Sequence, residues 1–166
     1  MRSGVAEVLN VTQALRHADA VCQARKVRLT PHRRAVFELV FRHGRPIGAY
    51  EVLERLRGEA PRTAPIVVYR ALDFLLEQGL IHKLESLHAY VSCLHPEHAH
   101  AGQFLICSHC GGVTELVDEG IAERVQAAAA AVGFRPLQPV IEISGLCARC
   151  ERGDDGPRHA RISAEP

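Results

Sequence analysis

The sequence predicts an α+β protein built in two parts. Four segments with helical periodicity fill residues 5–79, and two short alternating segments follow at 80–84 and 88–93. The second half has a different order, with candidate strands on both sides of one helix and two CxxC cysteine pairs. Helices followed by a hairpin are the order of a winged helix-turn-helix. The rest predicts a small C-terminal α/β domain that its cysteines hold together.

Composition limits the class of protein. The 166 residues suffice for one large or two small domains, and a formal net charge of +1 means that any basic surface has to be local. No segment approaches the ~20 apolar residues of a membrane span, and the N-terminus lacks the pattern of a signal peptide. We therefore expect a cytoplasmic protein without membrane contact, whose six cysteines are reduced or bound to metal.

The first three helices are predicted from periodicity and from signals at their ends. The first covers about residues 5–25. The second begins with Thr30 as N-cap and Pro31 at the first helical position, and it stops at Gly44. The third covers about residues 49–57. The positions expected to face the core are Val8, Thr12, Leu15, Ala18, Cys22, Val36, Phe37, Val40, Phe41, Val52, Leu53 and Leu56.

Pro65 opens a fourth helix, with Thr63 near its cap. Its expected core positions are Val68, Ala71, Leu72 and Leu75. Arg70 lies on the opposite face with Tyr69 beside it, where a recognition helix would meet the major groove. Tyr50, at the start of the third helix, is expected near them. Ordinary surface helices also carry a charged outer face, so this helix alone does not establish DNA binding.

Two cysteine pairs predict a metal site. They are Cys107 with Cys110 and Cys147 with Cys150. At this spacing one tight turn can direct both sulfurs of a pair at one tetrahedral ion, and two such turns supply the four thiolates of a closed structural zinc site. Gly111 and Gly112 suit the sharp turn after the first pair. The alternative is two unrelated reduced thiol pairs.

The C-terminal half is predicted to contain strands at 103–107 and 113–117, a helix from Asp118 to about residue 132, and a strand at 139–145. One side of this helix carries the apolar residues Ile121, Val125, Ala128 and Val132. A unit this small has a limited core, so a metal or a partner subunit would help to stabilise it. An apolar strand at its edge could pair with its copy and form a dimer. The predicted divisions are a winged-helix DNA-binding domain at 1–94, a hinge at 95–102, a dimerisation and structural-zinc domain at 103–150 and a disordered tail at 151–166.

Several motifs together closely resemble the ferric uptake regulator family of bacterial metal-responsive repressors. They are residues 27–31 (VRLTP) with Arg33, residues 68–72 (VYRAL) and the paired CxxC motifs. Within that family, Ala49-Tyr50, residues 69–80 and His82-Lys83 most resemble the zinc uptake regulator branch. The resemblance covers about residues 20–150. It implies a repressor of zinc-uptake genes that is an obligate homodimer and binds palindromic operator DNA when loaded with zinc.

The resemblance also implies two Zn²⁺ sites in each chain. The matching structural ligands are Cys107, Cys110, Cys147 and Cys150, and the matching ligands of a regulatory zinc between the domains are His82, Cys93, His100 and Glu115. Two imidazoles, a thiolate and a carboxylate suit tetrahedral zinc better than iron or manganese, which favour harder ligand sets. Tyr50 and Arg70 match residues that contact operator bases, with Tyr69 beside them. Glu54 and Arg57 match a charged pair that links neighbouring dimers on DNA.

Other functions stay open beside this reading. The same fold could sense another metal (iron, manganese or nickel) or peroxide, because a ligand list does not settle metal identity in cells. A second alternative is a DNA-binding protein with the structural zinc only, in which the matched regulatory ligands have no function. An enzyme is disfavoured because the sequence has no HExxH motif, nucleophile elbow or glycine-rich phosphate loop, and a four-cysteine site leaves no open position for water.

Two features are not explained by the resemblance. His95 and His98 lie beside His100, where they would form a further metal site, replace His100, or belong to a polar hinge. Val67 stands where the family usually has threonine or serine. Loss of that hydroxyl is expected to remove a helix cap, at a cost on the order of 1 kcal/mol, or one phosphate contact.

Overall fold

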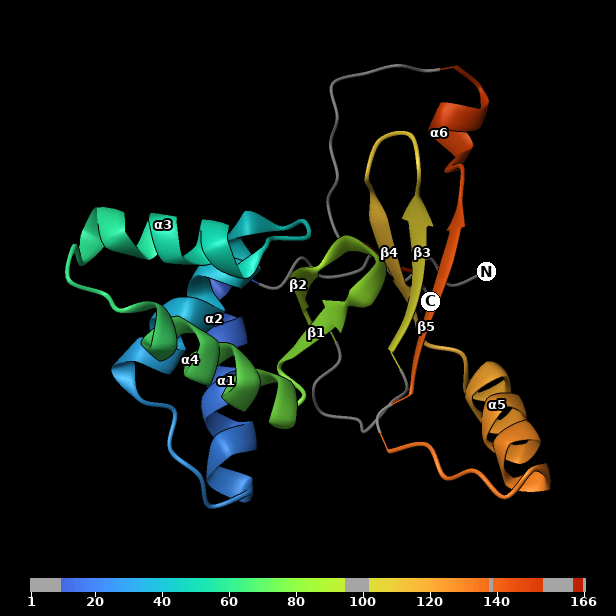
Figure 1. Ribbon diagram of the computed structural model, residues 1–166, viewed down its shortest axis with the longest axis horizontal. Coiled ribbons are helices and arrows are strands. Elements are labelled where there is room, and N and C mark those ends of the chain that lie inside the picture. The colour runs from blue at the N-terminus through green and yellow to red at the C-terminus, as the bar shows by residue number, and fades with distance from the viewer. Residues whose placement is uncertain (1–9, 95–101, 138, 154–162, 166) are drawn as a thin grey trace. The chain divides into compact units, whose positions relative to one another are not determined.

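The computed structural model describes residues 10–94, 102–137, 139–153 and 163–165 (Figure 1). Contacts between residues divide the chain into two compact units, one within residues 7–98 and the other within residues 99–166. The first unit contains helices and a two-stranded sheet, and the second contains a four-stranded sheet with helices. The predicted α+β class is therefore confirmed. In the part of the chain that the structure describes, no helix is long and apolar enough to cross a membrane.

Helices and a hairpin make up the first unit. They are α1 (Val11–Ala24), α2 (Pro31–His43), α3 (Ala49–Glu59), α4 (Pro65–Glu77), β1 (Ile81–Leu84), the 3-10 helix η1 (Glu85–Leu87) and β2 (Ala89–Ser92). The strands β1 and β2 pair antiparallel on either side of η1, as the alternation predicts. All four helices and the hairpin contribute to one core, and burial of each large aliphatic side chain contributes about 1.5–3 kcal/mol. Its fully buried members include Val40, Val52, Leu72 and Leu75.

The phase of α1 differs from the prediction. The helix begins after Asn10, whose side chain accepts a hydrogen bond from the Gln13 backbone at 2.9 Å while the Gln13 side chain bonds back to the Asn10 N–H. Its buried residues are Ala14, Ala18 and Cys22. Because this stripe repeats every four residues, Thr12 is exposed and its predicted inward position is wrong. Val8 lies outside the described residues.

The turn between α2 and α3 fixes where α3 begins. Gly44 ends α2 in the left-handed conformation, with φ of 64°. Beyond it, Ile47 and Tyr90 of β2 exchange backbone hydrogen bonds at 3.0 and 2.8 Å, which tie the turn to the hairpin. Tyr50 lies in the first turn of α3, so these contacts determine where its side chain emerges.

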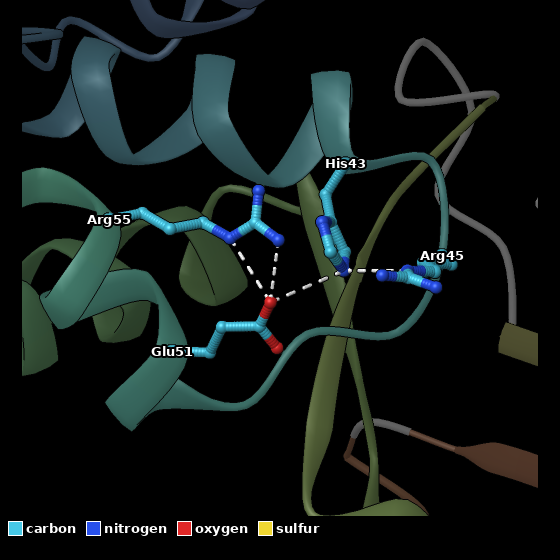
Figure 2. Close-up of polar contacts among 4 residues, drawn as sticks. All are labelled: His43, Arg45, Glu51 and Arg55. Carbon is cyan, nitrogen blue, oxygen red and sulfur yellow. Dashed lines mark hydrogen bonds and ion pairs between the residues drawn. The ribbon is translucent and has the colours of Figure 1, made fainter.

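Four polar side chains lie together around the same turn (Figure 2). The Arg45 Nε donates to the His43 Nε2 at 3.1 Å, so the imidazole acts as a neutral acceptor. On α3, Arg55 donates from Nε and Nη2 to the Glu51 Oε1 at 3.1 and 2.7 Å. The His43 Nε2 lies 3.9 Å from that same carboxylate oxygen. Burial, reinforced by the Arg55 charge, lowers the pKa of His43 below its ordinary value of 6.5.

This lowered pKa predicts a pH-dependent contribution to stability. The unfolded chain binds a proton at His43 more readily than the folded chain, so stability falls as the pH drops below the unfolded value of 6.5. We expect the stability of His43→Gln to fall less on acidification, because glutamine does not take up a proton. The melting temperatures of both proteins, compared from about pH 7.5 to about pH 5.5 at equal zinc loading, test this. The advantage of the wild type should shrink on acidification, and a constant difference would contradict the neutral role of His43.

The second unit is organised by strand β3. Its elements are β3 (Gly102–Cys107), β4 (Val113–Leu116), α5 (Glu119–Ala131), β5 (Val140–Gly145), α6 (Ala148–Glu151) and β6 (Ser163–Glu165). The sheet order is β5-β3-β4-β6, with β3 antiparallel to β4 and parallel to β5. The strand β6 pairs parallel with β4, whereas the sequence predicted a disordered tail over residues 151–166.

The helix α5 begins where the sequence predicts, but its apolar side is not buried. The Asp118 carboxylate accepts a hydrogen bond from the Ile121 backbone at 3.0 Å. None of the residues of α5 is buried, and Val132 just beyond it is 80% exposed. The apolar side of α5 is therefore not part of the core formed by the described residues. Its apolar side chains have no second layer to pack against among the described residues, because α5 makes few contacts with the strands.

Candidate metal centre and nucleic-acid interface

The sheet of the second unit brings the two CxxC motifs together. Cys107 is the last residue of β3 and lies opposite Gly145, the last residue of β5. Because β3 and β5 are parallel, both strands end at the same edge of the sheet. Each strand is followed by a tight turn that carries one cysteine pair. Gly111 follows the first pair with φ of 70°, a conformation that glycine adopts without strain. The second pair begins at the N-cap of α6, which is Cys147.

The four sulfurs fit one tetrahedral ion. The Sγ atoms of Cys107, Cys110, Cys147 and Cys150 all lie within 4.8 Å of one another. The Cys110 and Cys147 sulfurs are 3.9 Å apart, and two thiolates on a tetrahedral zinc with bonds of ~2.3 Å are separated by about 3.8 Å. This separation is far too long for a disulfide, and all four cysteines are free. A Cβ at Gly112 would come within 3.2 Å of the Cys110 sulfur, so glycine leaves room for it.

Backbone donors prepare part of this cluster for metal binding. Backbone N–H groups of Cys110 and Cys147 point at the Cys107 sulfur and lower its pKa to about 6; the Cys147 N–H lies 3.4 Å away. The pKa of Cys147 is lowered by the backbone N–H of Cys150. Hydrogen bonding of the Cys150 thiol to Cys147 instead raises its pKa to about 12. Because four thiolates cannot share one small volume without a cation, the donor set suits a divalent ion that replaces the protons.

The residues matched to a regulatory zinc are found in both units. His82 on β1 and Cys93, directly after β2, lie on the hairpin with their ligand atoms within 4.8 Å of each other. The Cys93 N–H bonds the Leu80 carbonyl at 3.0 Å, which holds the end of the hairpin. Glu115 lies on β4 of the second unit and its side chain is fully buried. His100 lies outside the described residues.

The residues predicted to contact DNA lie exposed on the helix-turn-helix. Tyr50 in the first turn of α3 is 72% exposed and Tyr69 on α4 is 49% exposed. Arg70 is exposed beside Tyr69, while Val68 next to them is buried. Both faces of α4 therefore lie as the helical period predicts.

The start of α4 differs in detail from the prediction. Its N-cap residue is Ala64, which has no side chain that could accept a hydrogen bond. The Thr63 hydroxyl instead donates to the Ala60 carbonyl at 2.8 Å. Val67 is the third residue of the helix, so a hydroxyl at this position would not occupy the N-cap. Of the two losses expected at Val67, the N-cap is therefore excluded, and the lost phosphate contact stays a prediction.

The model of the family described as "Ferric uptake regulator family" matches residues 24–144. This chain belongs to that family. The match includes the helices α2, α3 and α4, the hairpin and most of the second unit, so it covers both the candidate nucleic-acid interface and the first cysteine pair.

Zinc uptake regulators are among the most similar relatives of this family member. The zinc uptake regulation protein of Escherichia coli (strain K12) is 43% identical over 145 residues, which are 87% of this chain and 85% of the relative. The peroxide operon regulator of Bacillus subtilis (strain 168) is 28% identical over 131 residues, covering 78% of this chain and 88% of the relative. A solved zinc uptake regulator complexed with zinc and DNA matches at TM-score 0.82 and 40% identity, over 89% of this chain and 99% of that one.

Sequence reasoning did not find the backbone part of the metal centre. The N–H groups that point at the Cys107 sulfur belong to the peptide units of the turns, and no side chain marks them. It also did not find the bond from Arg57 to the loop before α4, where the Arg57 Nε donates to the Thr63 carbonyl at 3.2 Å. The nearest sequence signal for that bond is a basic residue in the last turn of a helix that precedes a short loop.

The cysteine geometry predicts that one zinc ion stabilises the second unit. We expect Cys110→Ser to lose a tightly held zinc per chain and to lower the melting temperature, because structural zinc contributes folding free energy directly. Cys93→Ser is the control, since Cys93 lies on the hairpin and not in this cluster. Metal content after exhaustive dialysis, with a thermal melt, measures both effects. A Cys110→Ser protein that keeps its zinc and its stability would disprove the four-cysteine site.

Proposed function

We propose that this protein is a zinc-responsive transcriptional repressor. The observation that carries the proposal is a recognition helix with exposed Tyr69 and Arg70 in a chain 40% identical to a zinc uptake regulator solved with zinc and DNA. Zinc is the co-repressor, the genes controlled are those of zinc uptake, and the protein acts on DNA in the cytoplasm. It has no catalytic role, since a metal held by four sulfurs has no open position for water or substrate.

The first zinc ion has a structural role in this proposal. It is held by Cys107, Cys110, Cys147 and Cys150. Their spacing and separations support a closed tetrahedral site. When bound, the ion offsets the repulsion between thiolates and joins the ends of β3 and β5 through their turns. No residue of α5 is buried, so the core of the second unit is small. The binding free energy of the ion would add stability that this core does not supply.

A second zinc ion acts as the regulatory signal. Its proposed ligands are His82, Cys93, His100 and Glu115. The proximity of His82 and Cys93 on the hairpin supports this set, as does its single soft donor, which favours zinc. The ligands come from both halves of the chain, so the bound metal would favour one arrangement of the DNA-binding helices. If DNA prefers the same arrangement, zinc and DNA each strengthen the binding of the other by the same factor.

DNA is recognised by a homodimer. The strand β5 lies at the edge of the sheet, and Val140 and Ile143 on it are 42% and 50% exposed. Pairing of this edge with a second copy would bury these apolar side chains and place two recognition helices on a palindromic operator. Tyr50 and Arg70 then contact bases. Where two dimers bind one operator, Glu54 and Arg57 are proposed to link them.

Another metal or peroxide is the competing signal. The peroxide operon regulator of Bacillus subtilis is 28% identical to this chain, which makes peroxide a signal to compare with zinc. Cys93 argues for zinc, because a thiolate is softer than the ligands that iron and manganese prefer. A comparison of operator binding with zinc, iron, manganese and nickel at buffered free concentrations distinguishes these signals.

The regulatory role is tested by operator binding across buffered free zinc. The probe is a labelled duplex selected from a random library by the zinc-loaded protein, and fluorescence anisotropy measures its binding. We expect DNA binding to appear only as a second zinc loads onto a chain that already holds one. Cys93→Ser should keep the first zinc and lose the zinc response. If binding is equal at all zinc concentrations in the wild type, zinc is not the signal.

The role of Arg70 in base recognition gives a separate prediction. Arg70→Ala should weaken binding to the selected duplex by about 1–3 kcal/mol if the guanidinium reads a guanine. Binding to a duplex of scrambled sequence should change much less. Zinc content and melting temperature serve as controls for folding. An unchanged affinity for the selected duplex would remove Arg70 from the interface.

A further inference from the structure

We infer that Arg57 positions the start of the recognition helix α4, independently of any contact between dimers. This inference rests on the proposed function, because it concerns how α4 is presented to DNA. The loop involved spans residues 60–64 and joins α3 to α4 (Figure 1). In a helix-turn-helix this connection sets the angle and the start of the second helix, so its restraints bear directly on base recognition.

The start of α4 lacks the usual side-chain restraints. Its N-cap, Ala64, supplies no acceptor, and no acidic residue lies in the first turn. Pro65 at the first helical position fixes one backbone angle but donates no hydrogen bond. Something other than a cap must therefore hold the loop in one conformation.

Contacts around Thr63 supply that restraint. The Thr63 backbone N–H and hydroxyl both donate to the Ala60 carbonyl, at 3.0 and 2.8 Å, which makes the loop a compact turn. The Thr63 carbonyl then accepts the Nε–H of Arg57 at 3.2 Å. This part-buried bond joins the last turn of α3 to the residue before the N-cap of α4. A charged donor to a backbone carbonyl is among the stronger hydrogen bonds in proteins.

The ion pair of Arg57 is the weaker of its two contacts. The Arg57 Nη1 lies 3.4 Å from the Glu54 Oε1, and the two side chains are 41% and 49% exposed. Pairs this exposed contribute little to stability, since water and salt screen them. The Nε–H that bonds Thr63 is a different atom from the Nη1 that faces Glu54. The bond to the loop therefore does not depend on the charge that the ion pair uses.

Lysine at position 57 separates the two roles. It keeps the positive charge, so it retains an attraction to Glu54 and to any acidic group of a neighbouring dimer. Its side chain has a methylene where arginine has the Nε–H, so it loses the observed bond to Thr63. Arg55→Lys is the matched control: Arg55 is on the same helix, 48% exposed, and its 2.7 Å ion pair is with Glu51.

The first measurement compares DNA binding of the zinc-loaded full-length proteins. The probe is the selected duplex shortened until it holds one dimer, which excludes contacts between dimers. Arg57→Lys should lower the ratio of its affinity for this duplex to that for a scrambled duplex by about fivefold, the factor for one hydrogen bond. Arg55→Lys should leave the ratio unchanged. A ratio for Arg57→Lys equal to that of the wild type would overturn the inference.

The second measurement does not depend on DNA. Hydrogen–deuterium exchange is followed in peptides that cover residues 58–68, with zinc content and melting temperature recorded for each variant. Exchange there should be faster in Arg57→Lys and unchanged in Arg55→Lys. Unchanged exchange in Arg57→Lys overturns the inference even if DNA binding falls. Faster exchange in a protein whose wild type shows no zinc-dependent DNA binding would support the restraint and reject the proposed function instead.

Discussion

The parallel pairing of β3 with β5 is the constraint on which the second unit depends. It carries both CxxC motifs to one end of the sheet, where four sulfurs lie within 4.8 Å of one another. Parallel strands need a long connection, and here residues 108–139 supply it through β4 and α5. Because no side chain of α5 is buried, the core of this unit is small, and a metal bound at the strand ends would compensate for it. The long spacing between the cysteine pairs thus follows from the topology.

Most of the first unit could be predicted from sequence because its signals are local. Proline at the first position of α2 and α4, glycine at the end of α2 and the four-residue spacing of apolar side chains each act within one helix. The inner faces of α3 and α4 are buried as expected. The error at Thr12 arose because the first helix begins at Val11, after its N-cap Asn10, and its buried stripe starts at Ala14. No proline or glycine marked that start.

The rest could not be predicted because it depends on distant partners. Apolar periodicity identifies α5 as amphipathic, but it does not say whether the chain or a second copy covers Val125 and Val132, which remain exposed. The CxxC spacing was enough to predict the four cysteines as a candidate metal site, since it reflects the geometry of a single turn. The set of His82, Cys93, His100 and Glu115 has no such spacing. It came only from the family resemblance, and no periodicity or motif would have joined these residues.

The two proposed zinc ions would act on stability in different ways. An ion at the four-cysteine site joins segments that the sheet already brings together, so its binding free energy adds to folding. An ion at the regulatory ligands adds to folding only a part of its binding free energy. The remainder favours one arrangement of the DNA-binding helices, and only that part appears as a change in DNA affinity. A rigid loop before α4 matters for the same reason. A recognition helix that moved freely would have to be ordered when DNA binds, and this ordering would cost part of the free energy that zinc supplies. In the proposed mechanism the Arg57 bond to Thr63 would reduce that cost and so favour base recognition by Arg70.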